Sequence, residues 1–435
     1  MSLTFACGHS GKEGHSRLCP HLVGVEDVPY ARVLRGQGLQ ADLCCAACAK
    51  RIKDARIEKE NAVQWLFVCE ACVELLDENE WDLVEWIGQP GIEEQPVPFN
   101  QILNSVALPD AVQQAVALAP LDSARLLGFW NNTLFEIGQN RVERLCEAEL
   151  PAQRINSSGG HPLALRLHVS PDGHFAALCH DYGCYGVVVD LHEKRVTMSL
   201  DKGDYRNEHT PFSAAFFRFE GQTLLVHATD WNRLDVSDPR SGQLLSSRTS
   251  PSYRGAEERP QHYLDYFHGQ LHVSPDEQWI ADDGWVWAPV GVVASWNIAR
   301  WIGGNVWESE DGVTRHRLCE RPYLWNIPVA WLDAEHVAVW GIGSDDEMML
   351  SGARVFDVSN GQETTAFAGP TCKAFFGGNG RLFSVEDDGL HIWNATTGAR
   401  LGQIEGFKPA WQRGDCLIEL NGNTMKNWNW RTAFD

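Results

Sequence analysis

Cysteine and histidine residues with metal-ligand spacing are concentrated at the beginning of the sequence. Seven of its 13 cysteines lie within the first 72 residues. They include four closely spaced pairs: Cys7-x-His9, Cys19-x-His21, Cys45-x-x-Cys48 and Cys69-x-x-Cys72. Two thiolates three residues apart on a tight turn can face one ion, and Zn²⁺ takes four sulfur or nitrogen ligands. The eight side chains therefore predict two structural zinc ions.

The sequence leaves the grouping of these ligands open. In a sequential arrangement the two CxH pairs hold one ion and the two CxxC pairs hold the other. In an interleaved arrangement the first pair joins the third, and the second joins the fourth. Cys44 is an alternative to Cys45, and His15 is an alternative to one of the histidines. The interleaved spacing resembles RING-type modules, and CPHL at 19–22 before two CxxC pairs resembles ubiquitin-protease-type zinc fingers.

Other chemistry of paired cysteines fits the pattern less well. A disulfide framework is typical of secreted chains, and MSLTFACGHSG lacks the basic and apolar segments of a secretory signal. We therefore expect a cytoplasmic protein. A redox CxxC needs one pair at the start of a helix, and a catalytic zinc keeps one coordination position open. The sequence contains no GxSxG, Walker A, HExxH or dinucleotide-binding motif, so we assign no catalytic residue.

The charge balance argues against two classes of partner. The formal net charge is −22, from 36 basic and 58 acidic residues, and neither end of the chain is basic. Proteins that bind nucleic acid or anionic membranes need a cationic surface. No apolar run approaches the ~18 residues of a membrane-spanning helix. We therefore expect a protein partner, without nucleic acid or membrane.

The chain divides into two domains of different composition. Residues 49–64 contain no Gly or Pro and predict a helix, and 73–88 repeat apolar residues near the helical period until Gly88. Prolines at 96 and 98 then predict a boundary. We expect a small α+β zinc-binding domain over 1–95, a linker with a short helix over 96–120, and a mainly β domain over 121–435.

An internal repeat runs through the second domain. LHVSPD occurs at 167–172 and again at 271–276, each time before an apolar segment. Similar turns recur near residues 132, 172, 221, 276, 333, 379 and 414. Their mean spacing is close to the ~40–45 residues of a four-stranded propeller blade. The clearest unit is 372–405, with expected strands at 381–385, 390–394 and 399–404.

These features resemble the WD40-like β-propeller superfamily. Asp190, Asp357 and Asn394 stand where that family often has the Asp of its Trp-Asp pair, although the pair itself is not intact. The resemblance implies about seven blades over 121–435. It also implies that the last strands, around 425–430, close the ring against an early segment.

Nine of the 18 tryptophans lie between residues 279 and 340. Most are expected in the blade cores. The stretch 299–325 reads as an insertion, and Trp301, Trp307, Arg315 and Arg317 within it are candidate partner-binding residues because Trp and Arg are enriched at interfaces. The expected function is a protein-interaction scaffold that binds a protein through the propeller face and the zinc domain. The alternative is an enzyme, either a RING-like ubiquitin ligase or a propeller hydrolase with a loop-borne site.

Overall fold

The computed structural model describes residues 17–25, 30–34, 41–54, 64, 66–68, 72, 76, 92–153, 161–249, 258–287, 289–342, 349–371 and 373–434. The expected ligands Cys7, His9 and Cys69 lie outside these ranges, as does most of the helix expected over 73–88. The described part of the chain holds no helix long and apolar enough to cross a membrane.

The amino-terminal elements form one small sheet with a helix. In spatial order the strands are β2 (Ala31–Leu34), β3 (Ala41–Cys44), β1 (Arg17–Leu18) and β4 (Leu66–Phe67). The 3₁₀ helix η1 (Pro20–Leu22) follows β1, and α1 (Ala46–Asp54) follows β3. The helix expected from residue 49 thus begins three residues earlier. The sheet and the helix share a small apolar core, which includes Cys19, Cys44 and Cys48.

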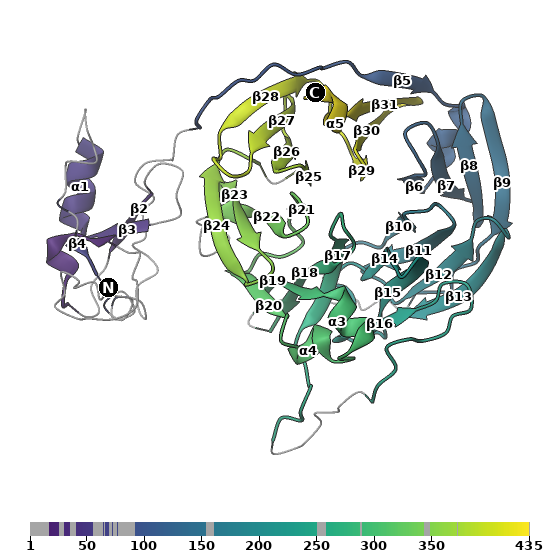
Figure 1. Ribbon diagram of the computed structural model, residues 1–435, viewed down its shortest axis with the longest axis horizontal. Helices are drawn as coiled ribbons and strands as arrows, with labels where there is room; N and C mark the ends of the chain where they lie inside the picture. The colour runs from purple at the N-terminus through teal and green to yellow at the C-terminus, as the bar shows by residue number, and fades with distance from the viewer. Residues whose placement is uncertain are drawn as a thin grey trace.

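From β5 (Asn104–Ala107) onward the described residues form a seven-bladed β-propeller, as the sequence predicted (Figure 1). Each blade is an antiparallel sheet whose first strand faces the middle of the ring. The strands of the first three blades are β6 (Ala117–Pro120), β7 (Leu126–Trp130), β8 (Thr133–Gly138) and β9 (Arg141–Glu147); β10 (Ala164–Val169), β11 (Phe175–Asp181), β12 (Tyr185–Asp190) and β13 (Arg195–Asp201); β14 (Ala214–Phe219), β15 (Gln222–Asp230) and β16 (Arg233–Ser237).

The remaining four blades complete the circle. Their strands are β17 (Phe267–Val273), β18 (Trp279–Val286), β19 (Val290–Asn297) and β20 (His316–Pro322); β21 (Val329–Trp331), β22 (His336–Ile342), β23 (Leu350–Asp357) and β24 (Gln362–Ala368); β25 (Phe375–Gly378), β26 (Arg381–Val385), β27 (Gly389–Asn394) and β28 (Arg400–Glu405); β29 (Trp411–Arg413), β30 (Cys416–Asn421), β31 (Thr424–Asn429) and β5 (Asn104–Ala107). The short helices are η4 (Asp110–Gln114), α3 (Ile298–Gly303), α4 (Glu308–Asp311) and α5 (Trp430–Ala433).

The ring is closed by strands from both ends of the propeller sequence. β31 pairs antiparallel with β5, with Met425 opposite Val106. This matches the expected closure by residues 425–430. The segment 96–120, expected as a linker, contributes β5 to the last blade and β6 to the first. Its short helix is the single 3₁₀ turn η4. The ring therefore includes strands that lie before the expected boundary at residue 121.

The repeated SPD turn has one structure in both copies. In the first, Ser170 Oγ donates to Asp172 Oδ1 at 2.6 Å and accepts from the Phe175 amide at 2.9 Å. In the second, Ser274 makes the same two bonds, to Asp276 at 2.6 Å and from the amide of Trp279 at 2.9 Å. Six of the seven expected turns join the first and second strands of a blade. The one near residue 132 joins the second and third strands, β7 and β8, instead.

The residues at the Trp-Asp position close the turn between the third and fourth strands. Asp190 Oδ1 accepts the amides of His192 and Glu193, and Asn394 Oδ1 accepts those of residues 396 and 397. An Asx turn needs a short side-chain oxygen at this position, and Asn meets that need as well as Asp.

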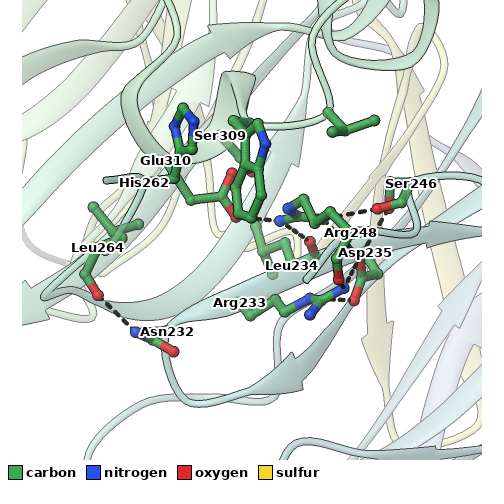
Figure 2. A network of polar contacts seen from close by, with 12 residues as sticks. Asn232, Arg233, Leu234, Asp235, Ser246, Arg248, His262, Leu264, Ser309 and Glu310 are labelled. Atoms are coloured by element: carbon green, nitrogen blue, oxygen red, sulfur yellow. Dashed lines mark hydrogen bonds and ion pairs between the residues drawn. The ribbon is translucent and has the colours of Figure 1, made fainter. Parts of the chain in front are cut away.

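The third blade departs from the four-stranded pattern. In the described residues its sheet contains β14, β15 and β16, and segment 243–248 follows β16 irregularly. Side chains replace part of the missing ladder: the Ser246 hydroxyl accepts the Val236 amide, and Arg248 donates to the Leu234 carbonyl. Arg248 also contacts Asp235 and Glu310, which belong to β16 and α4 (Figure 2). This buried network joins the third blade to the insertion of the fourth.

A buried lysine offers a test of the packing between the second and third blades. Lys202 Nζ donates to the carbonyl oxygens of Thr210 and Pro211 at 3.1 and 3.3 Å. Burial lowers its pKa from 10.5 to about 8, although Asp181 opposes the shift. Since the unfolded chain then holds more protons between these values, stability rises with pH across this window by up to ~3 kcal/mol.

We therefore expect Lys202→Met to remove that pH dependence. Urea unfolding at pH 7.5 and pH 10 measures it as the difference between the wild type and the variant. Parallel pH slopes in the two proteins would show that Lys202 is charged and well solvated in the folded state.

Candidate metal centre

Two parallel strands bring the candidate ligands together. β1 pairs with β3 in parallel, with Leu18 opposite Leu43, so the residues after both strands leave the sheet at the same edge. β1 leads into the Cys19–His21 turn, where Pro20 occupies the first position of η1. β3 leads into Cys45, and α1 follows directly. The amide of Cys45 donates to Cys19 Sγ at 3.3 Å, which fastens the two turns to each other.

The resulting cluster has four donors. Ligand atoms of Cys19, His21, Cys45 and Cys48 all lie within 4.8 Å of one another. His21 Nδ1 is 3.6 Å from Cys45 Sγ and 3.3 Å from Cys48 Sγ. A tetrahedral zinc with ordinary bond lengths places a thiolate sulfur and an imidazole nitrogen ~3.6 Å apart. Three sulfurs and one nitrogen in this geometry fit Zn²⁺, and the cluster could hold such an ion.

The thiols affect one another's ionisation. Burial raises the pKa of Cys48 to about 12, and the nearby Cys19 adds to the shift. Burial acts in the same direction on Cys45, but hydrogen bonds from the backbone and side chain of Cys48 outweigh it and lower the Cys45 pKa overall. Several thiolates so close together repel each other, and a divalent cation removes that repulsion because it binds the deprotonated form.

The observed grouping differs from both arrangements considered from the sequence. The second pair, Cys19/His21, meets the third pair, Cys45/Cys48, whereas the sequential and interleaved schemes each give the second pair another partner. Cys44 was an alternative to Cys45, but it is fully buried in the small core and burial raises its pKa to about 12. Cys72 is also buried, and it lies outside the four-donor cluster.

Comparison with known proteins finds similarity to solved structures but to no sequence family. No family model matches the chain, and no curated protein is a significant match. The chain is similar to solved structures. One is a chain of the mitotic checkpoint complex, with 12% identity, a TM-score of 0.46, and coverage of 81% of this chain and 99% of that one. Another is U3-55K, with 12% identity, a TM-score of 0.43, and coverage of 76% and 99%.

A third similar structure is BamB from Moraxella catarrhalis, with 11% identity, a TM-score of 0.40, and coverage of 77% of this chain and 98% of that one.

The four candidate partner-binding residues lie in different environments. Trp301 is completely buried between the third and fourth blades, with its ring 5.9 Å from that of Trp296. Trp307 is half-buried and stacks on His262 at 4.5 Å. Arg315 donates to the Ser309 carbonyl and lies over Tyr266. Arg317 is exposed and pairs with Glu320. The burial of Trp301 argues against a direct contact between its ring and a partner.

Exposed aromatic side chains lie instead on loops that the sequence analysis did not single out. Tyr205 and Trp287 are 49% and 44% exposed, and both contact the buried Phe267. The available signal was the WVWAP hairpin tip at 285–289, where an aromatic follows the end of a strand. Most of the other tryptophans in this region are in the cores, as expected; Trp285, Trp296, Trp331 and Trp340 are buried.

Proposed function

We propose that this chain is a protein-interaction scaffold: a zinc-stabilised amino-terminal domain joined to a propeller that binds a protein partner. The observation that carries the zinc half is the donor set of Cys19, His21, Cys45 and Cys48. Four protein side chains complete a tetrahedron, so a zinc ion bound there has no open position for a substrate or an activated water. Such an ion stabilises a fold and performs no chemistry.

A second ion is part of this proposal. Once the second and third pairs share one site, Cys7, His9, Cys69 and Cys72 remain, and they have the same composition of one CxH and one CxxC pair. We expect two zinc ions per chain, which metal analysis of the purified protein measures directly. A propeller has no need of metal, because its blades bury their faces against each other.

Cobalt substitution tests whether the described site is structural. Co²⁺ bound to three thiolates and one imidazole gives intense tetrahedral d–d absorption. We expect this spectrum to remain unchanged when azide is added, because no coordination position is open. A spectrum that shifts with added azide would indicate an open position, and it would favour an enzyme over the scaffold.

The interaction half is tested on the full chain isolated gently from its own cells. We expect the scaffold to co-elute with a defined partner in gel filtration, at an apparent mass well above the 48.6 kDa of the chain. A chain that elutes alone under these conditions would contradict the proposed scaffold.

A further inference from the structure

One face of the propeller gathers an aromatic cluster from four loops. In an antiparallel blade, the turn between the second and third strands opens on the same face as the connection to the next blade. Tyr205 lies on the connection after β13, Trp231 on the β15–β16 turn, Trp287 on the β18–β19 turn and Trp325 on the connection after β20. The helices α3 and α4 follow β19 and therefore lie toward the opposite face.

The rings of this cluster form a continuous series of contacts. Trp325 packs on Trp285 with centroids 5.8 Å apart, and Trp285 stacks on Phe267 at 4.4 Å with an angle of 7°. Phe267 then meets Trp231 at 4.4 Å and Tyr205 at 5.9 Å. Tyr205 and Trp287 are exposed at the border of this column. A rigid, partly exposed aromatic surface of this kind offers a large contact area at a low entropic cost.

Hydrogen bonds hold the loops that carry the cluster. Trp325 Nε1 donates to the His209 carbonyl at 3.0 Å, which joins the connection after β20 to the one after β13. Asn232 Nδ2 donates to the Leu264 carbonyl at 2.7 Å, which fixes the β15–β16 turn against the segment before β17 (Figure 2). The surface is thus built in advance of any partner.

The charges around the cluster favour a cationic partner. Asp204, Asp230 and Asp265 are exposed, and each lies within two residues of a ring of the cluster in the sequence. Within the chain itself, the guanidinium of Arg206 lies over the Trp287 ring, 5.3 Å from its centroid. A planar guanidinium stacks well on an aromatic face, and nearby carboxylates strengthen the attraction to a cation.

We propose that this face binds an arginine-bearing basic segment of a protein partner, with Tyr205 and Trp287 as the aromatic contacts and the three aspartates as the surrounding anions. The proposal rests on the proposed scaffold function and names the chemistry of its partner. Arg206 occupies the Trp287 ring within the free protein, so the incoming guanidinium must compete with it.

The test uses the full chain and a fluorescent peptide in which arginines alternate with glycines. Matched peptides carry citrulline, a neutral isostere, or glutamate in place of arginine. Fluorescence anisotropy is expected to detect binding of the arginine peptide and to detect none with the other two. Trp287→Ala should weaken binding about tenfold, whereas Arg206→Ala should tighten it by removing the competitor. Val313→Ala is the control, because Val313 is 72% exposed on the β19–β20 connection.

The opposite signs expected for Trp287→Ala and Arg206→Ala separate recognition from a general loss of folding. Equal affinity of the wild type and Trp287→Ala for the arginine peptide, or equal binding of the citrulline peptide, would overturn the proposal. If the chain still leaves gel filtration with a partner in that case, the scaffold function stands and only this docking surface is wrong.

Discussion

Replacing Cys48 by serine is expected to unfold the amino-terminal domain while the propeller keeps its stability. Cys48 is buried and contributes one of the four donors. The apolar core around it is small, so the zinc ion that we propose would supply much of the folding free energy of this domain. Hydrogen-exchange mass spectrometry should show loss of protection in peptides covering 17–54, with unchanged protection in β6–β31. Metal analysis should show a loss of at least one of the two expected zinc ions per chain, because both proposed sites lie in this domain.

Cys44→Ala is the matched control for this experiment. Cys44 lies in the same core and is completely buried, but it does not belong to the four-donor cluster. This variant should keep its zinc and lose only ~1–2 kcal/mol of stability to the cavity. Zinc loss by Cys44→Ala, or retention of zinc and protection by Cys48→Ser, would contradict the assignment of donors.

The spacing of the ligands predicted which side chains could hold a metal ion, but it did not predict which pairs come together. CxH and CxxC pairs identify the side chains that can face an ion, because that depends on local turns. Which pairs meet depends on strand pairing between segments more than 20 residues apart. The parallel contact of β1 with β3, which places Cys19 beside Cys45, joins segments separated by β2 and leaves no local signal.

The propeller was easier to predict from the sequence because its turn motifs repeat. Each SPD turn is closed by its own serine and aspartate, so the motif at 170–172 predicts the structure at 274–276. The beginning of the ring was harder to predict from the sequence. β5 forms the edge of the last blade with three of its four residues exposed, so it lacks the apolar alternation of a core strand. The exposed Trp287 was also hard to separate from its buried neighbours by composition alone.

Arg248→Met is expected to destabilise the propeller by ~3–5 kcal/mol, because it leaves buried carboxylates without their partner. The side chains of Arg248 and Asp235 are each 2% exposed, and their charged atoms are 2.7 Å apart. Glu310, 5% exposed, contacts the same guanidinium. Asp235 keeps its ion pair with Arg233 at 2.8 Å in this variant. Most of the lost stability should therefore come from the unpaired carboxylate of Glu310.

Two further variants test this explanation. Arg218→Met removes a surface ion pair with Glu277 in which the arginine is 58% exposed, and it should cost less than ~1 kcal/mol. Adding Glu310→Gln to Arg248→Met should restore part of the lost stability, since it removes the unpaired charge.

An unpaired buried carboxylate has a folded-state pKa above its unfolded value. The deficit of Arg248→Met should therefore shrink as the pH falls toward 5, and urea unfolding at pH 5 and pH 7.5 measures this. A pH-independent deficit would mean that the destabilisation comes from lost packing on Trp307, 5.3 Å from the guanidinium, and not from the buried charges.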